Sequence, residues 1–125
     1  VLVLTDKGLG QIHFKKITMT QKAEFYDKQV RSRHIRNGFN ASLTGLKNGS
    51  LATGYLSDSD NDGLWTSMYL GGEAFRYATT KSPEALENIR ESLDAMERLF
   101  TINPVPGFAA RSFERSGFIS SLADP

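Results

Sequence analysis

Residues 82–100 read SPEALENIRESLDAMERLF, and they carry the clearest helical pattern in the chain. Ser82 is a favourable helix N-cap, and Pro83 suits the first helical position, where its missing N–H would have no intrahelical partner in any case. Apolar residues then recur at the helical period: Leu86, Ile89, Leu93, Met96 and Phe100. Pro104 cannot continue a helix, so the pattern predicts an amphipathic helix that ends near residue 103.

A second helical pattern precedes this one and begins after Asp62-Gly63. Its repeat consists of Leu64, Met68, Gly71, Phe75 and Ala78. Other apolar residues occupy the remaining sides, and a helix that is apolar on nearly every side is expected to be largely buried. Gly71 and Gly72 each cost about 1 kcal/mol relative to alanine, which a close helix contact or the approach of a ligand would explain.

These two helices would form an αα-hairpin with a short turn at residues 79–82. Each would have about 18 residues and a length of roughly 27 Å. One helix that is buried all round beside one that is amphipathic fits an inner and outer pair of a larger helical array.

The N-terminal residues predict a different element. Residues 1–5 are rich in apolar and β-branched side chains, a glycine turn follows, and residues 11–16 alternate between apolar and polar. Residues 1–17 are therefore expected to form a β-hairpin, which needs a surface to pack on because an isolated hairpin is marginal in water. Thr18 opens a capping box, so a long helix is expected from there to Gly38, its natural C-terminal stop.

The remaining segments show no regular periodicity. Residues 40–57 are rich in Gly, Ser, Thr and Asn, and we expect a long loop, which in a compact domain is often functional. Residues 104–125 are expected to form a C-terminal loop that lies over the helix ends. The predicted fold class is mainly α. The hairpin of residues 1–17 precedes a helical fragment, residues 18–125, in which the long helix and the αα-hairpin are part of an incomplete array.

Composition restricts the classes of partner. The chain has 15 basic and 14 acidic residues, so it lacks the basic excess that a nucleic-acid-binding protein shows. No apolar run approaches the roughly 20 residues of a membrane span. Cysteine is absent, which excludes disulfides, thiol catalysis and cysteine-based zinc sites.

The chain begins at Val1 and stops at Pro125 without a closing element, so we expect a fragment that is completed by more of the same protein or by a neighbouring chain.

The one concentrated chemical feature is the acidic loop of residues 57–63, SDSDNDG. Asp58, Asp60 and Asp62 stand at alternate positions before a glycine, a spacing at which oxygen ligands converge on Ca²⁺ when the backbone curls. An EF-hand also needs a glutamate at its twelfth position, and that position is Tyr69 here. The loop is therefore a candidate calcium site of another type, with the three aspartates as ligands.

The same loop is also a candidate catalytic site. Asp62 stands at the mouth of the second helix with Trp65 one turn further on, and carboxylates beside an aromatic side chain are what glycoside hydrolysis uses as acid and base. Asp62 would be the acid or base and Asp60 its partner, while Trp65 would stack on a sugar ring. Arg111 in the C-terminal loop would hold a substrate carboxylate in a bidentate contact.

A purely structural role is the third interpretation. Aspartate and asparagine cap helices, and a negative charge is favourable at the positive end of the helix dipole, so capping alone would account for Asp60 or Asp62. His13 and His34 lie far apart in sequence and do not indicate a metal pair. His34 is expected on a solvated helix end.

Three stretches resemble parts of known families. Residues 3–10, VLTDKGLG, resemble a blade repeat of the two-component-regulator type of β-propeller, in which a strand runs into a Thr-x-x-Gly-Leu turn. Residues 58–69, DSDNDGLWTSMY, together with residues 75–78, FRYA, resemble a helical segment that follows such propellers in large bacterial surface proteins. Residues 106–112, PGFAARS, resemble a second motif of that segment, and helical regions of this type resemble (α/α) toroids of the six-hairpin glycosidase kind.

This resemblance implies the junction of a β-propeller with an incomplete (α/α) toroid, because a whole toroid needs many more helices than this chain has. It also implies that Asp60, Asp62 and Arg111 lie near one another on the active face. We therefore expect a fragment of an extracytoplasmic carbohydrate-active protein, hydrolase-like or glycan-binding, that is extracellular, periplasmic or at the cell surface. The alternative is a calcium-stabilised structural module of a surface assembly or filament.

Overall fold

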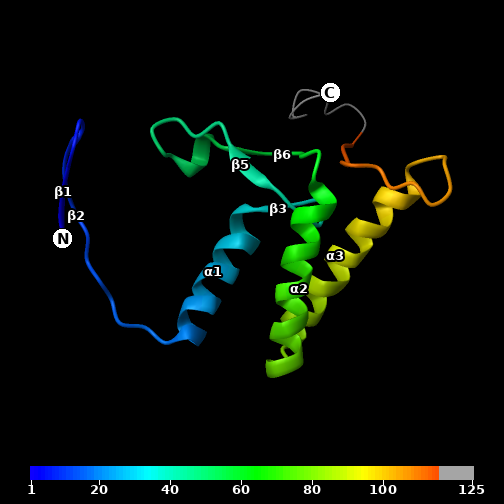
Figure 1. Cartoon of the computed structure of the whole chain (residues 1–125), viewed down its shortest axis with the longest axis horizontal. Helices are drawn as coiled ribbons and strands as arrows, with labels where there is room; N and C mark the ends of the chain where they lie inside the picture. The colour runs from blue at the N-terminus through cyan, green and yellow to red at the C-terminus, as the bar shows by residue number, and fades with distance from the viewer. Residues whose placement is uncertain (116–125) are drawn as a thin grey trace.

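The computed structural model describes residues 1–115, in which three α-helices dominate (Figure 1). Helix α1 spans Met19–Arg33, α2 spans Asp62–Thr80 and α3 spans Pro83–Thr101. Figure 1 shows α2 and α3 side by side, which confirms the predicted αα-hairpin. The fold is mainly α with small antiparallel strand pairs, and the helices of residues 1–115 do not form a toroid.

Local signals explain the tight connection between α2 and α3. The Ser82 hydroxyl accepts a hydrogen bond from the N–H of Ala85 at 3.4 Å, and Pro83 opens α3. Lys81 adopts a left-handed conformation with φ of 55°, and its N–H bonds back to the carbonyl oxygen of Tyr77 at 2.9 Å. This left-handed cap ends α2 and redirects the chain within two residues.

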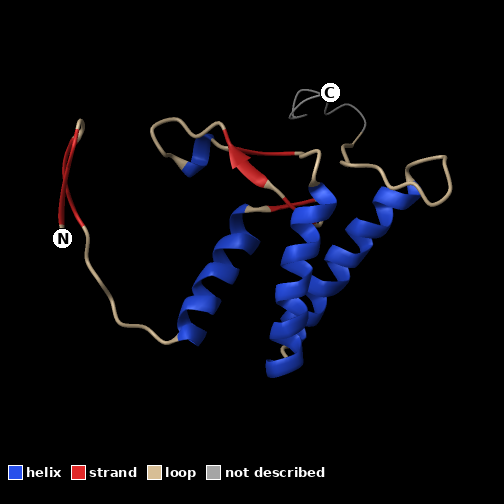
Figure 2. Cartoon of the chain, in the orientation of Figure 1, coloured by secondary structure: helices blue, strands red, loops and turns tan. Residues whose placement is uncertain are grey.

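The strands of residues 1–115 form three separate antiparallel pairs (Figure 2). The pairs are β1 (Leu2–Thr5) with β2 (Gly8–Gln11), β3 (Ile35–Arg36) with β4 (Phe39–Asn40), and β5 (Ser42–Thr44) with β6 (Tyr55–Ser57). The β1–β2 pair confirms a hairpin at the N-terminus, but the prediction of its second strand at residues 11–16 was wrong. That strand is Gly8–Gln11, where the glycine turn was expected, and residues 12–16 form no strand. In Figure 1 this hairpin stands apart from the helices, at the end of an extended segment that leads into α1.

The prediction that residues 40–57 form a loop without regular structure was wrong. The segment contains β5, a 3₁₀ turn at Leu51–Thr53 and β6. The register places Ser42 opposite Ser57 and Thr44 opposite Tyr55. Strands of three residues are too short to display a convincing alternation of apolar and polar residues, so periodicity does not reveal them.

Helix α1 also ends earlier than predicted. Its cap is His34, whose N–H bonds to the carbonyl oxygen of Val30, and Gly38 lies beyond it. Asn37 and Gly38, with φ of 53° and 86°, form the two-residue turn between β3 and β4, a geometry that Asn-Gly favours. A Cβ atom at Gly38 would lie 2.9 Å from the carbonyl oxygen of Glu91, so glycine also permits this turn to pack on α3.

The core lies between β4, α3 and the C-terminal segment. Its buried members are Phe39, Ala95 and Leu99, and Ala109, Ala110 and Phe113 pack against them. The rings of Phe39 and Phe113 stack with centroids 6.0 Å apart, and the Arg98 guanidinium lies over both rings. The N–H of Ala110 bonds to the carbonyl oxygen of Leu99 at 2.7 Å. Residues 109–113 therefore lie over the end of α3, as predicted, while residues 116–125 of the predicted loop lie outside the described residues.

The prediction that α2 is largely buried was wrong. Its buried residues are polar, namely Asp62, Thr66 and Glu73. Its apolar repeat is exposed instead: Leu64 by 53%, Met68 by 64% and Phe75 by 77%. The neighbours that cover α2 most extensively are α3 and β4, and they lie against the other side of the helix. None of the helices in the described part of the chain combines the length and the hydropathy that a membrane span requires.

Candidate functional site

The acidic loop leads into the first turn of α2, and Asp62 is its most buried member. Asp62 has no exposed surface. Its Oδ1 accepts a hydrogen bond from the N–H of Ser59 at 2.9 Å, and its Oδ2 accepts one from the N–H of Phe113 at 3.3 Å. This one side chain therefore closes the loop onto α2 and holds the C-terminal segment against the same helix end.

Burial raises the pKa of Asp62 from its ordinary 3.8 to about 6, because the charged form loses its hydration. The backbone N–H donors of Phe113 and Ser59 and the charge of Arg36 lower this pKa, while Asp58 raises it. A carboxyl group that titrates near pH 6 has the pKa of a general acid. All atoms of Asp62 are nevertheless covered in this structure, so a substrate has no direct contact with it.

Arg111 reaches the acidic loop and binds Asp60, which confirms that these two residues lie near one another. Its Nε donates to the Asp60 carbonyl oxygen at 2.8 Å, and its Nη2 donates to Asp60 Oδ2 at 3.0 Å. Both side chains are about 70% exposed, so the pair contributes little to stability. The guanidinium predicted to clamp a substrate anion is thus already bound to a carboxylate of its own chain.

The aspartates predicted as calcium ligands have different surroundings. Asp60 binds Arg111, Asp62 binds backbone N–H groups, and Asp58 is buried with 4% of its surface exposed. Within residues 1–115, no three acidic or histidine side chains converge so that they could hold a metal ion. Calcium binding stays a prediction, and it requires the Asp60–Arg111 pair to open.

Trp65 lines a hollow beside the acidic loop, between the N-terminal half of α2 and the strands β4 and β5. The hollow has a volume of about 650 Å³, and the Trp65 side chain is half exposed. The polar residues that line it are His34, Asn40, Ser42, Ser59 and Tyr69, and the apolar ones besides Trp65 are Ala41, Leu43 and Met68. We refer to this set as the Trp65 hollow. It combines an aromatic surface with several hydrogen-bonding groups, which is the composition of a site for a small polar ligand.

The surroundings of His34 and Tyr69, which line the Trp65 hollow, indicate which of their atoms carry a hydrogen. His34, predicted on a solvated helix end, is half-buried, and its Nδ1 lies 3.1 Å from the carbonyl oxygen of Ala41. A carbonyl oxygen only accepts, so Nδ1 carries the hydrogen and Nε2 of the neutral ring is an acceptor. Burial and the charge of Glu73 raise the pKa of Tyr69 to about 12, against the opposing effect of Arg31. The Tyr69 hydroxyl is therefore neutral at physiological pH.

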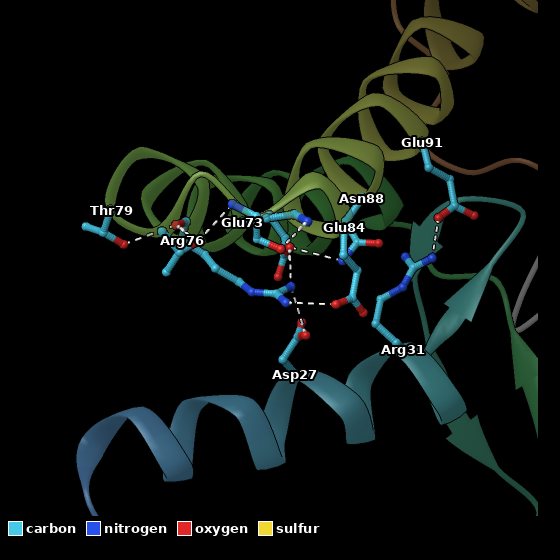
Figure 3. Close-up of polar contacts among 11 residues, drawn as sticks. Asp27, Arg31, Glu73, Arg76, Thr79, Glu84, Asn88 and Glu91 are labelled. Carbon is cyan, nitrogen blue, oxygen red and sulfur yellow. Dashed lines mark hydrogen bonds and ion pairs between the residues drawn. The ribbon is translucent and has the colours of Figure 1, made fainter.

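A cluster of charged residues at the seam of α1 with the α2–α3 hairpin was not predicted from the sequence (Figure 3). Arg76 on α2 lies 3.0 Å from Asp27 Oδ2 on α1 and 3.1 Å from Glu84 Oε2 on α3. Its Nη1 also lies 3.1 Å from Glu73 Oε2, which accepts a second hydrogen bond from Asn88 Nδ2 at 3.0 Å. The cluster thus joins all three helices. The signal in the sequence was Glu73, an acidic residue after the largely apolar stretch 64–72, and the structure shows that it is buried.

The carboxyl groups of Asp27 and Glu73 interact within this cluster. Burial raises the pKa of Glu73 above its ordinary 4.5, and a hydrogen bond to Asp27 acts in the same direction, against Asn88 and Arg76. Asp27 Oδ1 is buried, and no N–H or O–H group among the described residues is placed as its donor. A protonated Glu73 supplies that donor, because a hydrogen bond between two carboxyl groups needs one proton.

Glu73→Gln is expected to leave stability unchanged near pH 4 and to raise it above wild type at pH 8. The folded-state pKa of Glu73 is raised, so the wild-type protein loses stability as the pH rises through that value, whereas the amide of Gln keeps the donor at every pH. Urea unfolding of both proteins from pH 4 to pH 8 measures the difference. A variant that is less stable at both pH values would show that an ionised Glu73 paired with Arg76 is the stabilising form.

Comparison with protein-family models, with curated proteins and with solved structures finds no match to this chain.

Proposed function

We propose that this chain is the glycan-binding part of an extracytoplasmic carbohydrate-active protein, and that the Trp65 hollow is its binding site. The observation that carries the proposal is a half-exposed indole in a hollow of about 650 Å³ that polar residues from several elements also line. The C–H face of a sugar ring is apolar and packs on an aromatic ring, while its hydroxyl groups need donors and acceptors at the rim. The hollow offers both.

Hydrogen-bonding groups of both kinds surround the indole. Nε2 of the neutral His34 ring is an acceptor, whereas the Tyr69 hydroxyl oxygen is buried, so Tyr69 offers the hollow its ring. Ser42 and Asn40 add a hydroxyl and an amide from β5 and β4. The side chains of Asn40, Ser42 and Tyr69 carry no charge at neutral pH, so the site suits an uncharged polar ligand such as a neutral oligosaccharide.

Binding accounts for the geometry better than hydrolysis does. Hydrolysis of a glycosidic bond needs two carboxyl groups that touch the substrate from opposite sides. Asp62 is fully buried and bonded to two backbone N–H groups, and Asp60 is bound to Arg111. The catalytic roles of these two aspartates stay predictions. The contacts of Asp62 support a structural role other than helix capping, because its oxygens accept from the N–H groups of Ser59 and Phe113 and neither residue belongs to α2.

The exposed apolar face of α2 supports the further expectation that this chain works inside a larger assembly. Leu64, Met68 and Phe75 on this face are all more than half exposed, and a large exposed apolar surface marks an interaction site. The remainder of the same protein or a neighbouring chain would cover it. The extracytoplasmic location rests on the resemblance and stays part of the proposal.

Trp65→Ala is expected to weaken the binding of a neutral oligosaccharide by about tenfold or more, which corresponds to about 1.4 kcal/mol. The loss of the stacking surface is the physical reason. The probe is a panel of neutral hexasaccharides of β-linked glucose, xylose and mannose, with affinity measured by isothermal titration calorimetry. Trp65→Phe, which keeps an aromatic face, is expected to lose less.

Phe75→Ala is the matched control, because Phe75 is an exposed aromatic residue on the same helix but does not line the Trp65 hollow. It is expected to bind the panel as wild type does. Equal weakening by Phe75→Ala and Trp65→Ala, or unchanged affinity in Trp65→Ala, would place the glycan elsewhere. No binding of any neutral member by the wild-type chain would overturn the proposal.

A further inference from the structure

A second hollow, of about 650 Å³, lies beside the N-terminal half of α1, on the segment that connects this helix to the β1–β2 hairpin. Its charged and aromatic lining consists chiefly of Lys15, Lys16, Lys22 and Lys28 with Phe25 and Tyr26. We call these six residues the basic–aromatic hollow. Glu24 is the one acidic residue that lines it, so its lining carries a net charge of +3.

The lysine charges of this hollow are not compensated by the rest of the described chain. The ion pairs of residues 1–115 are made by arginines, and the structure places none of the four lysines in an ion pair. Two arginines near α1 are paired with acidic residues in this way. Arg31 binds Glu91, and Arg76 binds Asp27 in the charged cluster that joins the three helices. Arginines thus make the ion pairs of residues 1–115. The four lysines of the basic–aromatic hollow make none of them and are available to an external anion.

Two aromatic rings stand among these lysines without apolar cover. Phe25 and Tyr26 form an edge-to-face pair with centroids 5.3 Å apart, and each side chain is 56% exposed. Helix α1 has no buried residue at all, so these rings do not contribute to a core. Exposed rings beside cationic groups provide stacking surfaces for a ligand that is both flat-faced and charged.

The distribution of charge along the chain directs an anion to this region. Residues 1–36 contain eight basic and three acidic residues, a net charge of +5. Residues 37–125 contain seven basic and eleven acidic residues, a net charge of −4. The net charge of the whole chain is only +1 because the strongly basic N-terminal third is offset by the acidic remainder. A polyanion would be attracted to the side that carries the basic–aromatic hollow and repelled by the α2–α3 side.

We propose that the basic–aromatic hollow binds an anionic polysaccharide, that is, a chain of sugar rings bearing carboxylate or sulfate groups. The proposal rests on the proposed glycan-binding function and extends it from neutral to charged glycans. Lysine ammonium groups bind the anionic substituents, and the rings of Phe25 and Tyr26 pack on the sugar faces. A lipid surface is disfavoured because α1 has no continuous apolar stripe with which to lie in a membrane interface. A nucleic acid is disfavoured because the chain has a net charge of only +1, without the basic excess that nucleic-acid-binding proteins show.

The test uses the full chain and three soluble polymers: polygalacturonate, dextran sulfate and neutral dextran. The wild-type chain is expected to bind the first two and not dextran, and to lose affinity by at least tenfold between 50 and 200 mM salt because bound counterions are released. The variant in which all four lysines are replaced by Gln is expected to lose at least tenfold in affinity at 50 mM salt. Gln is a good helix former, so α1 is expected to persist, and circular dichroism checks this.

Lys47→Gln with Lys81→Gln is the matched control, since both lysines are exposed and neither lines the basic–aromatic hollow. This control is expected to bind the anionic polymers as wild type does. Phe25→Ala with Tyr26→Ala is expected to weaken binding while leaving the salt dependence in place. Trp65→Ala is expected to retain binding of the anionic polymers, so failure of the neutral-glycan site and failure of this one are distinguishable.

Four outcomes would overturn the proposal. These are equal binding of dextran and dextran sulfate, equal loss in the control lysine variant, unchanged affinity in the four-lysine variant, and tighter lysine-dependent binding of a 30-base single-stranded DNA or of anionic phospholipid vesicles than of either polysaccharide. The last would assign the surface to a nucleic acid or a membrane.

Discussion

Phe39→Ala is expected to lower the free energy of unfolding by about 4 kcal/mol, the largest effect of any single truncation in this fold. Phe39 is a fully buried aromatic residue at the centre of the core, where it stacks on Phe113 and lies beneath the Arg98 guanidinium. Truncation removes the apolar contact area and leaves a cavity that β4, a strand of two residues, has little capacity to fill. Urea unfolding followed by circular dichroism measures the loss.

The same variant tests how the C-terminal segment is held. Phe113 loses its stacking partner, so residues 109–113 are expected to separate from α3 more readily. Phe39→Leu retains most of the volume and is expected to cost about 1 kcal/mol. Phe14→Ala is the surface control, because its side chain is 85% exposed, and is expected to change stability by no more than about 0.5 kcal/mol. A loss below about 1 kcal/mol in Phe39→Ala would contradict the core described here.

Local signals sufficed to predict the elements that depend on local chemistry. The capping box of Thr18 with Gln21 forms as expected, with both hydrogen bonds present at 3.0 and 3.1 Å. The Ser82 cap and Pro83 set the start of α3. Each signal involves residues within one helical turn of each other, so neither depends on the tertiary arrangement.

The predictions that failed depended on the tertiary arrangement. Gly38 has the chemistry of a helix stop and of a hairpin turn, and contact with α3 determines which of the two forms. The burial of α2 was inferred from its composition alone. In the structure its polar residues Thr66 and Glu73 face the neighbouring elements, because the Thr66 hydroxyl accepts the N–H of Asn40 and Glu73 joins the charged cluster.

Only part of the candidate site was predicted, because its remaining residues come together only in the tertiary structure. The proximity of Asp60 and Arg111 follows from two motifs that the resemblance placed on one face, and their contact confirms it. The Trp65 hollow was found only through Trp65, since His34 and Asn40 reach it from other elements whose positions no local pattern reveals. The carboxyl pair of Asp27 and Glu73 joins residues of different helices, 46 positions apart in the sequence.

Asp62→Asn is expected to show a pH-dependent difference in stability from wild type that changes by about 2 kcal/mol between pH 4 and pH 8. Burial raises the folded-state pKa of Asp62 from 3.8 to about 6. The folded protein therefore holds this proton more tightly than the unfolded chain does, and wild type loses stability as the pH rises through that interval. The variant has no such proton, so its own stability does not change for this reason.

The sign of the difference at each pH follows from the contacts of Asp62. Near pH 4 the carboxyl is neutral, and the Asn variant is expected to be the less stable protein, because its NH₂ group faces either the Ser59 or the Phe113 N–H donor. Near pH 8 wild type bears a buried charge, and the gap between the two proteins is expected to close or reverse. Urea unfolding of both proteins at intervals of half a pH unit follows this difference, which is expected to level off above about pH 6.

Asp60→Asn is the control, since its carboxylate is largely exposed, and its difference from wild type is expected to vary by no more than about 0.5 kcal/mol over the same range. Desolvation raises the pKa of Asp62, whereas its hydrogen bonds and Arg36 lower it, so the direction of the pH dependence shows which effect is larger. A gap that widens as the pH rises would mean that two backbone N–H groups and the Arg36 guanidinium outweigh desolvation and stabilise the ionised carboxylate. Asp62 would then be a preorganised anion at the end of α2, and the raised pKa on which a general acid depends would be absent from this loop.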